Sequence, residues 1–389
     1  MSARQFYIVL ALSTIAMKMQ KLPSLVSSEL GKDTWLFFAL FGLINVIGIL
    51  LVFIIFKRVD PKTVLKPTKN TFFNILRFFL MFATLIYFLV QAVLVYEHIQ
   101  GLFANTLFDD LSWSFFSLLL LFAVFFLAHR GIENIALNFE LFTWIIVVSF
   151  VLLAIFGAVQ TDYSVILPLE TINFKNILAN LKKFSCWFGD FFLILYLGIK
   201  AREIKLSKTL LVYSLSMIFT TFLVVVFTGI YDKTASMAPG LISVISEQSL
   251  LDISIGRIDW FLILFTEMGA ILTCSVHLYF ANLCIHAMFP RSKSFYLKFI
   301  NIAVLYILDI FVLVDLNEKI KFFCGFMSDV TVAIQLATII ILLGIAIFNA
   351  AYLKKDKSGK IVSVKTSRLN DKSRANVKQK QPQNKEVVA

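Results

Sequence analysis

Long, predominantly apolar runs are the feature that most restricts how this chain can fold. Residues 36–56 and 141–159 are two of them, and neither shows the apolar–polar alternation of a barrel strand. A helix needs about 20 such residues to cross the roughly 30 Å hydrocarbon core of a bilayer. With 59% hydrophobic residues and a mean hydropathy of +0.85, the chain has too few polar side chains to cover a soluble fold of its size. The sequence therefore predicts an all-α integral membrane protein.

Ten segments are apolar enough to count as membrane spans, and charged loops separate them. They cover residues 5–28, 34–56, 72–96, 112–129, 136–159, 177–199, 208–230, 257–287, 296–315 and 328–353. Basic residues concentrate in the loops after the even-numbered segments, for example Lys57, Arg58 and Lys62 after the second. Cytoplasmic loops carry the excess of Lys and Arg. The pattern predicts ten transmembrane helices with the N- and C-termini both in the cytoplasm.

The chain divides into a spanning part and a basic tail. Residues 1–353 are expected to form one ten-span permease-like domain, and residues 354–389 a disordered cytoplasmic tail. The tail is polar and poor in large apolar side chains, so it cannot bury enough surface to fold. It carries much of the net charge of +12, which we interpret as an orientation signal and not as nucleic-acid binding. Attraction of the tail to membrane lipid with anionic head groups is the alternative interpretation.

The first segment is interrupted by polar residues and a proline. Residues 17–23 read MKMQKLP in an otherwise apolar stretch. Proline lacks a backbone N–H and clashes with the preceding turn, so we expect the helix to break or kink between Met19 and Leu22. A broken helix at membrane depth must turn its freed backbone groups towards a cavity or towards other protein.

The sixth segment is also irregular, at residues 184–190, which read FSCWFGD. Gly189 permits unwinding there, and Asp190 puts a carboxylate inside the hydrophobic boundary. Such a group is costly unless it is partnered, and it usually marks a ligand or ion pathway. Counted as five plus five helices, the two interrupted helices are the first of each half, which is where transporter sites lie. This placement predicts a five-plus-five inverted-repeat permease fold in which Lys18 and Asp190 face one cavity.

Short motifs in a characteristic order connect the chain to a known family. They are Arg4-Gln5, Leu22-Pro23-Ser24, residues 29–35, residues 130–136, Leu167-Pro168-Leu169, Gly189-Asp190 and residues 256–259. Across roughly residues 3–350 they resemble the GerAB-type spore-germination proteins. These are permease-like subunits of endospore nutrient receptors within the amino acid–polyamine–organocation (APC) superfamily. The resemblance implies a LeuT/APC-like fold in the inner spore membrane, a small nutrient bound between the first, third, sixth and eighth helices, and two partner subunits, a membrane subunit and a lipoprotein.

Candidate ligand-binding residues come from the two breaks and from the helices expected to line them. They are Met17, Lys18, Met19, Gln20, Pro23, Tyr87, Trp187, Gly189, Asp190 and Glu267. Lys18 is expected to supply a cation that pairs with Asp190 or with an anionic group of the ligand. Asp190 and Glu267 are expected to bind the ligand or to carry protons. Tyr87 and Gln91 lie one helical turn apart, and they either line the site or bond to a neighbouring helix. Unlike relatives in the wider superfamily, this chain has no glycine in its first break.

No constellation of catalytic or metal-ligating residues is visible in the sequence. There is no glycine-rich phosphate loop, and neither the four histidines nor the four cysteines have ligand-like spacing. We therefore expect no enzyme activity, no cofactor and no metal. Three functions stay open: a germinant-receptor subunit that binds an amino acid or similar nutrient, an autonomous proton-coupled amino acid transporter, and a membrane scaffold whose pocket no longer binds a ligand.

Overall fold

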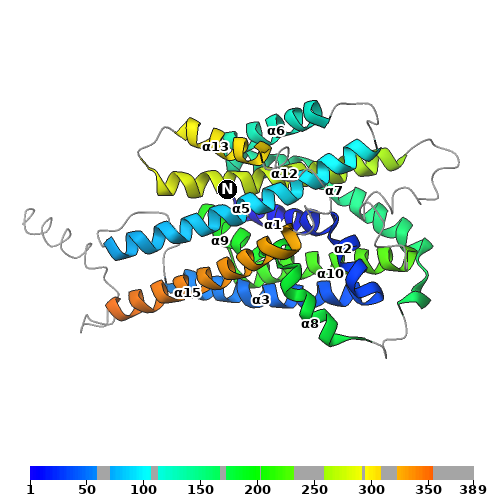
Figure 1. Cartoon of the computed structure of the whole chain (residues 1–389), viewed down its shortest axis with the longest axis horizontal. Helices are drawn as coiled ribbons and strands as arrows, with labels where there is room; N and C mark the ends of the chain where they lie inside the picture. Colours follow the sequence, from blue (N-terminus) through cyan, green and yellow to red (C-terminus); the bar gives the residue numbers. More distant parts are fainter. Residues whose placement is uncertain are drawn as a thin grey trace, which may run out of the picture.

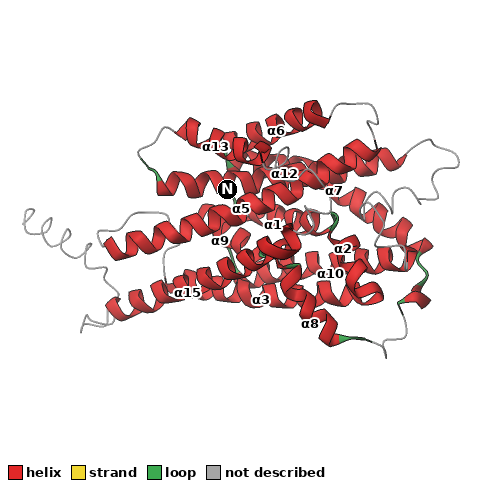
Figure 2. Ribbon diagram, in the orientation of Figure 1, coloured by secondary structure: helices red, strands yellow, loops and turns green. Residues whose placement is uncertain are grey.

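The chain is a bundle of helices (Figure 1). The computed structural model describes residues 1–58, 71–106, 113–166, 172–201, 203–231, 258–290, 294–307 and 322–353. Its α-helices are α1 (Ala3–Lys18), α2 (Leu22–Leu30), α3 (Thr34–Arg58), α5 (Thr71–Thr106), α6 (Trp113–Arg130), α7 (Ile132–Gln160), α8 (Phe174–Lys183), α9 (Asp190–Lys200), α10 (Leu206–Tyr231), α12 (Ile258–Met288), α13 (Ser294–Ile307) and α15 (Ser328–Leu353). Three 3-10 turns, η1 (Gly31–Asp33), η2 (Tyr163–Val165) and η4 (Ser185–Trp187), and one π-helical turn, η8 (Phe322–Met327), complete the described elements. Every element in the described part of the chain is helical (Figure 2).

Six helical stretches are long and apolar enough to cross a membrane, so the chain is an integral membrane protein. They are Leu22–Lys57, Asn74–Ile99, Ile132–Gln160, Leu206–Tyr231, Leu262–Met288 and Phe322–Gly344. Helix α6 contains a shorter apolar stretch, and α1, α9 and α13 are too short to span alone. The predicted count of ten goes beyond these six stretches and stays a prediction. The predicted tail, 354–389, lies outside the described residues.

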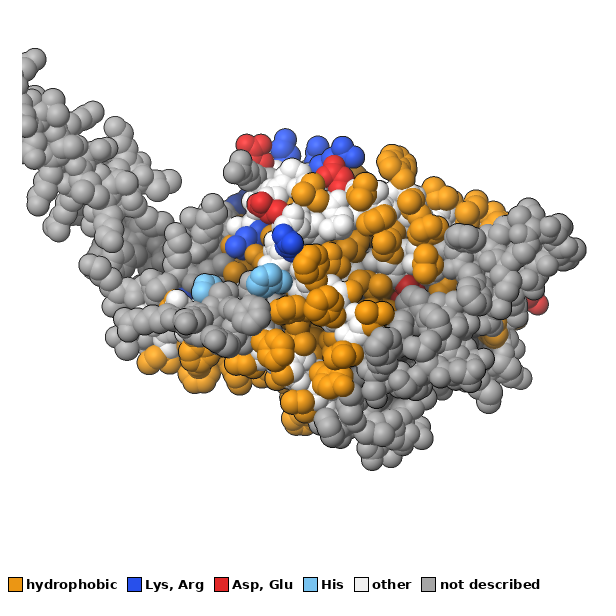
Figure 3. Space-filling view, turned by 90° about the horizontal axis from the view of Figure 1, so that it is seen from above, with side chains coloured by type: hydrophobic (Ala, Val, Ile, Leu, Met, Phe, Trp, Pro, Cys, Tyr) orange, Lys and Arg blue, Asp and Glu red, His pale blue; other side chains and the backbone are white. Residues whose placement is uncertain are grey.

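Helices α1, α5 and α12 form the interior of the bundle. Helix α1 lies in the middle of the view and packs against α7, α9, α10 and α12 (Figure 1). Helix α12 packs most extensively against α5, and these two are the most buried of the six spanning stretches. Helix α7 instead exposes large apolar side chains, including Leu141, Trp144 and Val159. Apolar side chains cover much of the described surface in Figure 3, while charged ones gather along one edge. This is the surface expected of a helix bundle in lipid.

The first break lies where the proline predicts it. The backbone N–H of Met19 donates to the carbonyl of Ile15 at 3.0 Å, which closes α1, and α2 begins at Leu22. Pro23 occupies the first turn of α2, where a missing N–H costs no hydrogen bond. The residues between Lys18 and Leu22 are therefore the unwound part of this segment.

The predicted span over 177–199 is wrong in its first half. Residues of α8 bury only Ile177 and Asn180, and the helix ends in Lys182 and Lys183. The apolar residues of α8 alternate with polar ones at helical spacing, so it forms an amphipathic helix and not an apolar half-span. Ion pairs hold it to two neighbouring elements: Lys183 to Glu29 of α2 at 2.5 Å, and Lys182 to Asp329 of α15 at 2.8 Å. The chain then unwinds through η4 and enters α9 at Asp190.

Candidate functional site

The two helix breaks meet at a buried ion pair. The Nζ of Lys18 donates to Oδ1 and to Oδ2 of Asp190, each at 2.8 Å. Lys18 is 0% exposed and Asp190 is 7% exposed, so both charges are withdrawn from solvent. The two side chains predicted to face one cavity thus contact each other directly, across 172 residues of sequence.

The ends of two helices explain why these charges sit here. Lys18 is the last residue of α1, where free carbonyl groups carry partial negative charge. Asp190 is the first residue of α9, where free N–H groups carry partial positive charge. Each side chain is therefore stabilised by its own helix end and by its partner.

Two aromatic side chains complete the surroundings of the pair. The Tyr213 hydroxyl of α10 donates to Oδ2 of Asp190 at 2.9 Å, and Tyr213 is fully buried. The Lys18 Nζ lies 5.3 Å from the centre of the Phe188 ring, which adds a cation–π contact. Phe188 in turn stacks on Phe41 of α3, with ring centres 3.8 Å apart. These contacts hold the break of the sixth segment against α3 and α10. Both buried charges therefore have several partners.

Polar side chains at the first break have unused hydrogen-bonding capacity. Within the described residues, neither the amide oxygen nor the amide nitrogen of Gln20 has a partner, nor has the Ser24 hydroxyl. Both residues are 2% exposed. Buried polar groups are nearly always hydrogen-bonded, so these atoms are suited to a partner that enters from outside the fold. Met17 and Met19, also predicted as site residues, are buried and supply apolar surface next to them.

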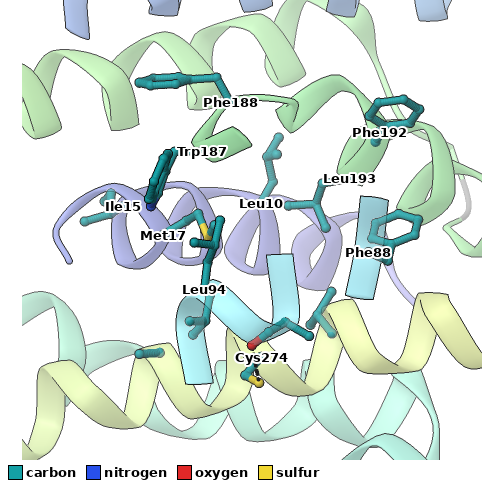
Figure 4. Packing of buried hydrophobic residues seen from close by; sticks show 14 of the residues in the cluster. Leu10, Ile15, Met17, Phe88, Leu94, Trp187, Phe188, Phe192, Leu193 and Cys274 are labelled. Carbon is teal, nitrogen blue, oxygen red and sulfur yellow. Dashed lines mark hydrogen bonds between the residues drawn. The ribbon is translucent and has the colours of Figure 1, made fainter. Parts of the chain in front are cut away.

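Side chains of α5 hold the unwound part of the sixth segment. A Cβ atom at Gly189 would lie 2.3 Å from the Tyr87 hydroxyl, so only glycine allows this close approach. The Gln91 amide donates to the carbonyl of Cys186, which is the interhelical bond left open as an alternative to a site-lining role. Trp187 belongs to the same buried hydrophobic cluster as Met17, at the packed centre seen in Figure 4. Tyr87 and Trp187 therefore help to fix the position of the unwound residues before α9.

Glu267 lies apart from the ion pair in the described contacts. It is 0% exposed on α12, and its Oε1 is 3.3 Å from Nε2 of His98 on α5. The geometry of that contact is not that of a hydrogen bond, and neither carboxylate oxygen of Glu267 has another partner among the described residues. The site residues thus fall into two groups, one around Lys18 and Asp190 and one around Glu267.

Sequence reasoning did not single out Tyr213, Phe188 or His98. Tyr213 is the one tyrosine within the predicted span 208–230 and has no spacing that indicates a role, and Phe188 is one of 42 phenylalanines. His98 lies two residues beyond the predicted span 72–96, whereas α5 continues to Thr106 and carries both His98 and Tyr87. The spacing of the four histidines gives no sign of this contact, because the partner of His98 is a carboxylate on another helix.

Comparisons with known proteins agree with this architecture. The sequence profile of the family described as "Spore germination protein" matches residues 1–319. A comparison with curated protein sequences found no significant match. Among solved structures, a manganese transporter of Eremococcus coleocola, in complex with an aromatic bis-isothiourea substituted compound, is similar with a TM-score of 0.54. The similarity covers 96% of this chain and 84% of that chain at 11% sequence identity, so it shows a shared fold alone.

Proposed function

Because the chain belongs to the spore germination protein family, we propose that it is the permease-like membrane subunit of a spore germinant receptor. It binds a small nutrient, an amino acid, at the breaks of its first and sixth spans and helps to trigger germination. The observation that carries this proposal is the Lys18–Asp190 contact, which joins the two breaks at one buried place. Family membership supports the proposed process, and this contact supports the proposed position of the site.

The proposed arrangement has ten transmembrane helices in two inverted repeats of five. Helices α1 and α2 together form the first span, and η4 with α9 forms the sixth, which the amphipathic helix α8 precedes. Both termini lie in the cytoplasm, and the membrane is the inner membrane of the spore. The APC-type fold and the two interruptions support this arrangement. A second membrane subunit and a lipoprotein are the proposed partners, and they follow from the family resemblance alone.

An amino acid carries the two charges that match this pair. Its carboxylate complements Lys18, and its ammonium group complements Asp190. A zwitterion that enters between them replaces one buried ion pair by two, so no buried charge is left unpaired. The Gln20 amide and the Ser24 hydroxyl offer unused donors and acceptors for further polar atoms of the ligand. Met17, Met19 and Trp187 supply apolar contact, while Pro23, Tyr87 and Gly189 shape the two breaks.

An autonomous proton-coupled amino acid transporter is the second candidate function. The observation that favours it is the buried His98–Glu267 contact, because a coupled transporter needs a group that binds a proton. Uptake of labelled amino acids by proteoliposomes that contain this chain alone would establish transport. A receptor subunit would bind the same amino acid without uptake.

Replacing Gln20 by leucine tests the ligand site. The substitution removes two buried, unpartnered polar atoms at similar volume, so the ligand-free protein should become about 1–3 kcal/mol more stable. The same variant should lose most of the thermal shift that a nutrient amino acid gives the wild type. Thermal unfolding of the purified chain in detergent, with and without single amino acids, measures both effects.

Gln91→Leu is the matched control, because Gln91 is a buried glutamine with a partner inside the fold. Loss of its bond to the Cys186 carbonyl should destabilise the protein by about 1–3 kcal/mol, which is the opposite sign. If Gln20→Leu destabilises the protein as Gln91→Leu does, Gln20 is satisfied within the fold and its ligand role fails. If no nutrient shifts the wild type, the alternative of a scaffold with an empty pocket is favoured.

A further inference from the structure

A polar face of α15 runs along the unwound residues that precede α9. Ser328, Thr331 and Gln335 lie at positions i, i+3 and i+7, which places them on one side of the helix. The Ser328 hydroxyl donates to the carbonyl of Lys183 at 2.6 Å, and the Gln335 amide donates to the carbonyl of Phe188. One face of α15 therefore bonds to both ends of the unwound stretch.

The middle of the same stretch bonds to α15 and to η8, the turn before it. The Ser185 hydroxyl donates to the carbonyl of Ser328 at 3.1 Å. The Cys186 thiol lies 3.4 Å from the Thr331 hydroxyl and donates to the carbonyl of Phe323 at 3.3 Å. Cys186 is 0% exposed, and Ser328 and Thr331 are 1% exposed, so water does not compete for these bonds.

The π-helical turn η8 takes part in this contact with its backbone and with a ring. The Phe323 carbonyl accepts from the Cys186 thiol and also from the Ser328 hydroxyl, the latter at 2.8 Å. The ring of Phe323 meets the ring of Trp187 edge-on, with centres 6.4 Å apart. Single π-helical turns are rare and frequently lie at functional sites. The break of the sixth segment is thus held by η8 and α15 along its whole length.

Unwound backbone at membrane depth needs partners from the protein, because no water is available there. The carbonyls of Lys183 and Phe188 have side chains of α15 as partners, and the carbonyl of Cys186 has Gln91 of α5. Phe188 lies two residues before Asp190, the buried carboxylate of the candidate site. The bond from α15 to Phe188 therefore acts on the part of the break that bears this carboxylate.

We propose that Gln335 and Ser328 are positioning residues for the nutrient site, so that α15 belongs to the site as well. The inference rests on the function proposed above, because it takes the two breaks as the place where the nutrient binds. The family resemblance implies the first, third, sixth and eighth helices, and α15 is not among them. Gln335 and Ser328 act through the backbone carbonyls that they hold, and not by contact with the nutrient.

The contribution of these bonds to binding is preorganisation. A break held in one position needs no further ordering when the nutrient enters, which saves conformational entropy on binding. A break that takes several positions binds with an affinity reduced by the fraction that is in the competent position. Loss of the bond from Gln335 should therefore weaken binding of the nutrient, even in molecules that are fully folded.

Gln335→Leu tests this role in the purified full-length chain in detergent. The common amino acids are added singly to the wild type, and the one that gives the largest thermal shift is the probe. Isothermal titration then measures the dissociation constant of this amino acid, which we expect to rise roughly tenfold in Gln335→Leu. A purely structural residue would change the melting temperature and leave that constant unchanged. An unchanged dissociation constant overturns the proposal.

Ser328→Ala keeps the test decisive if Gln335→Leu does not fold. It removes the bond to the Lys183 carbonyl and should also raise the dissociation constant. Thr338→Val is the matched control, because Thr338 continues the same face of α15, is 0% exposed, and has no hydrogen-bond partner for its hydroxyl among the described residues. It should leave the dissociation constant unchanged. Equal weakening in Thr338→Val and Gln335→Leu would contradict a specific role of the bond to Phe188.

The outcomes separate this inference from the proposed function. If the wild type and both test variants bind the probe amino acid equally well, α15 does not position the site, and the proposed function stands. If no amino acid shifts the wild type, the proposed function fails, and this inference fails with it. Weaker binding in Gln335→Leu and in Ser328→Ala, with wild-type binding in Thr338→Val, supports both.

Discussion

Replacing Lys18 by methionine should lower the free energy of unfolding by about 3–5 kcal/mol. Methionine keeps an unbranched side chain, one heavy atom shorter than that of lysine, and removes the charge. Asp190 would then be buried without its counter-charge, with the Tyr213 hydroxyl as its described side-chain partner, and removal of one partner of a buried ion pair is strongly destabilising. Denaturation of the purified variant in detergent, followed by circular dichroism, measures the loss.

Two further variants separate charge from packing. Lys18→Met combined with Asp190→Asn should recover most of the loss, because no charge stays buried. Lys183→Met removes the same kind of side chain from an ion pair whose side chains are 37% and 41% exposed, and it should cost less than about 1 kcal/mol. Equal losses for Lys18→Met and Lys183→Met would show that the Lys18–Asp190 pair is not desolvated.

Gly189→Ala should destabilise the protein by about 1–3 kcal/mol. The backbone of Gly189 is extended, with φ of 170°, so alanine meets no conformational penalty there. The cost is steric, because the new methyl group would lie 2.3 Å from the hydroxyl and 2.7 Å from Cζ of Tyr87. Thermal unfolding of the variant measures this cost.

The steric origin predicts a rescue. Tyr87→Leu in the Gly189→Ala background should recover part of the stability, since it removes the ring that the methyl group meets. Gly344→Ala is the control: a Cβ there has no neighbour within 4 Å, so this variant should be as stable as the wild type or slightly more stable. If Tyr87→Leu recovers none of the stability lost in Gly189→Ala, the steric contact with Tyr87 is not the cause of that loss.

The positions of the two breaks could be predicted because single residues determine them. Pro23 cannot donate a hydrogen bond within the first segment, and Gly189 with Asp190 interrupts the sixth. The ionic character of Lys18 and Asp190 at membrane depth then implied that each needs a partner, and the structure joins them directly. Each of these inferences depends on the chemistry of one residue and on its position along its own helix, and both can be read directly from the sequence.

The properties that depend on two or more helices were less accessible. The amphipathic character of α8 is a property of one helix and could have been predicted, because Lys182 and Lys183 lie within the predicted span 177–199, but its apolar residues were interpreted as a continuation of that span. The His98–Glu267 contact joins residues 169 positions apart on α5 and α12, and no local pattern gives their distance. The partner of Asp190 on α10, Tyr213, was hidden for the same reason.

Ion pairs hold α8 to α2 and to α15, so the packing of this half of the sixth segment should depend on ionic strength. At 1 M salt the screening length is about 3 Å, so the exposed Lys182–Asp329 and Lys183–Glu29 pairs weaken, whereas the dry Lys18–Asp190 pair keeps its strength. Concentrated electrolyte should therefore loosen α8 while α9 stays anchored. The two halves of one segment therefore differ in their sensitivity to salt: α8 is held by exposed ion pairs that dissolved ions weaken, and α9 by a buried pair that they do not reach.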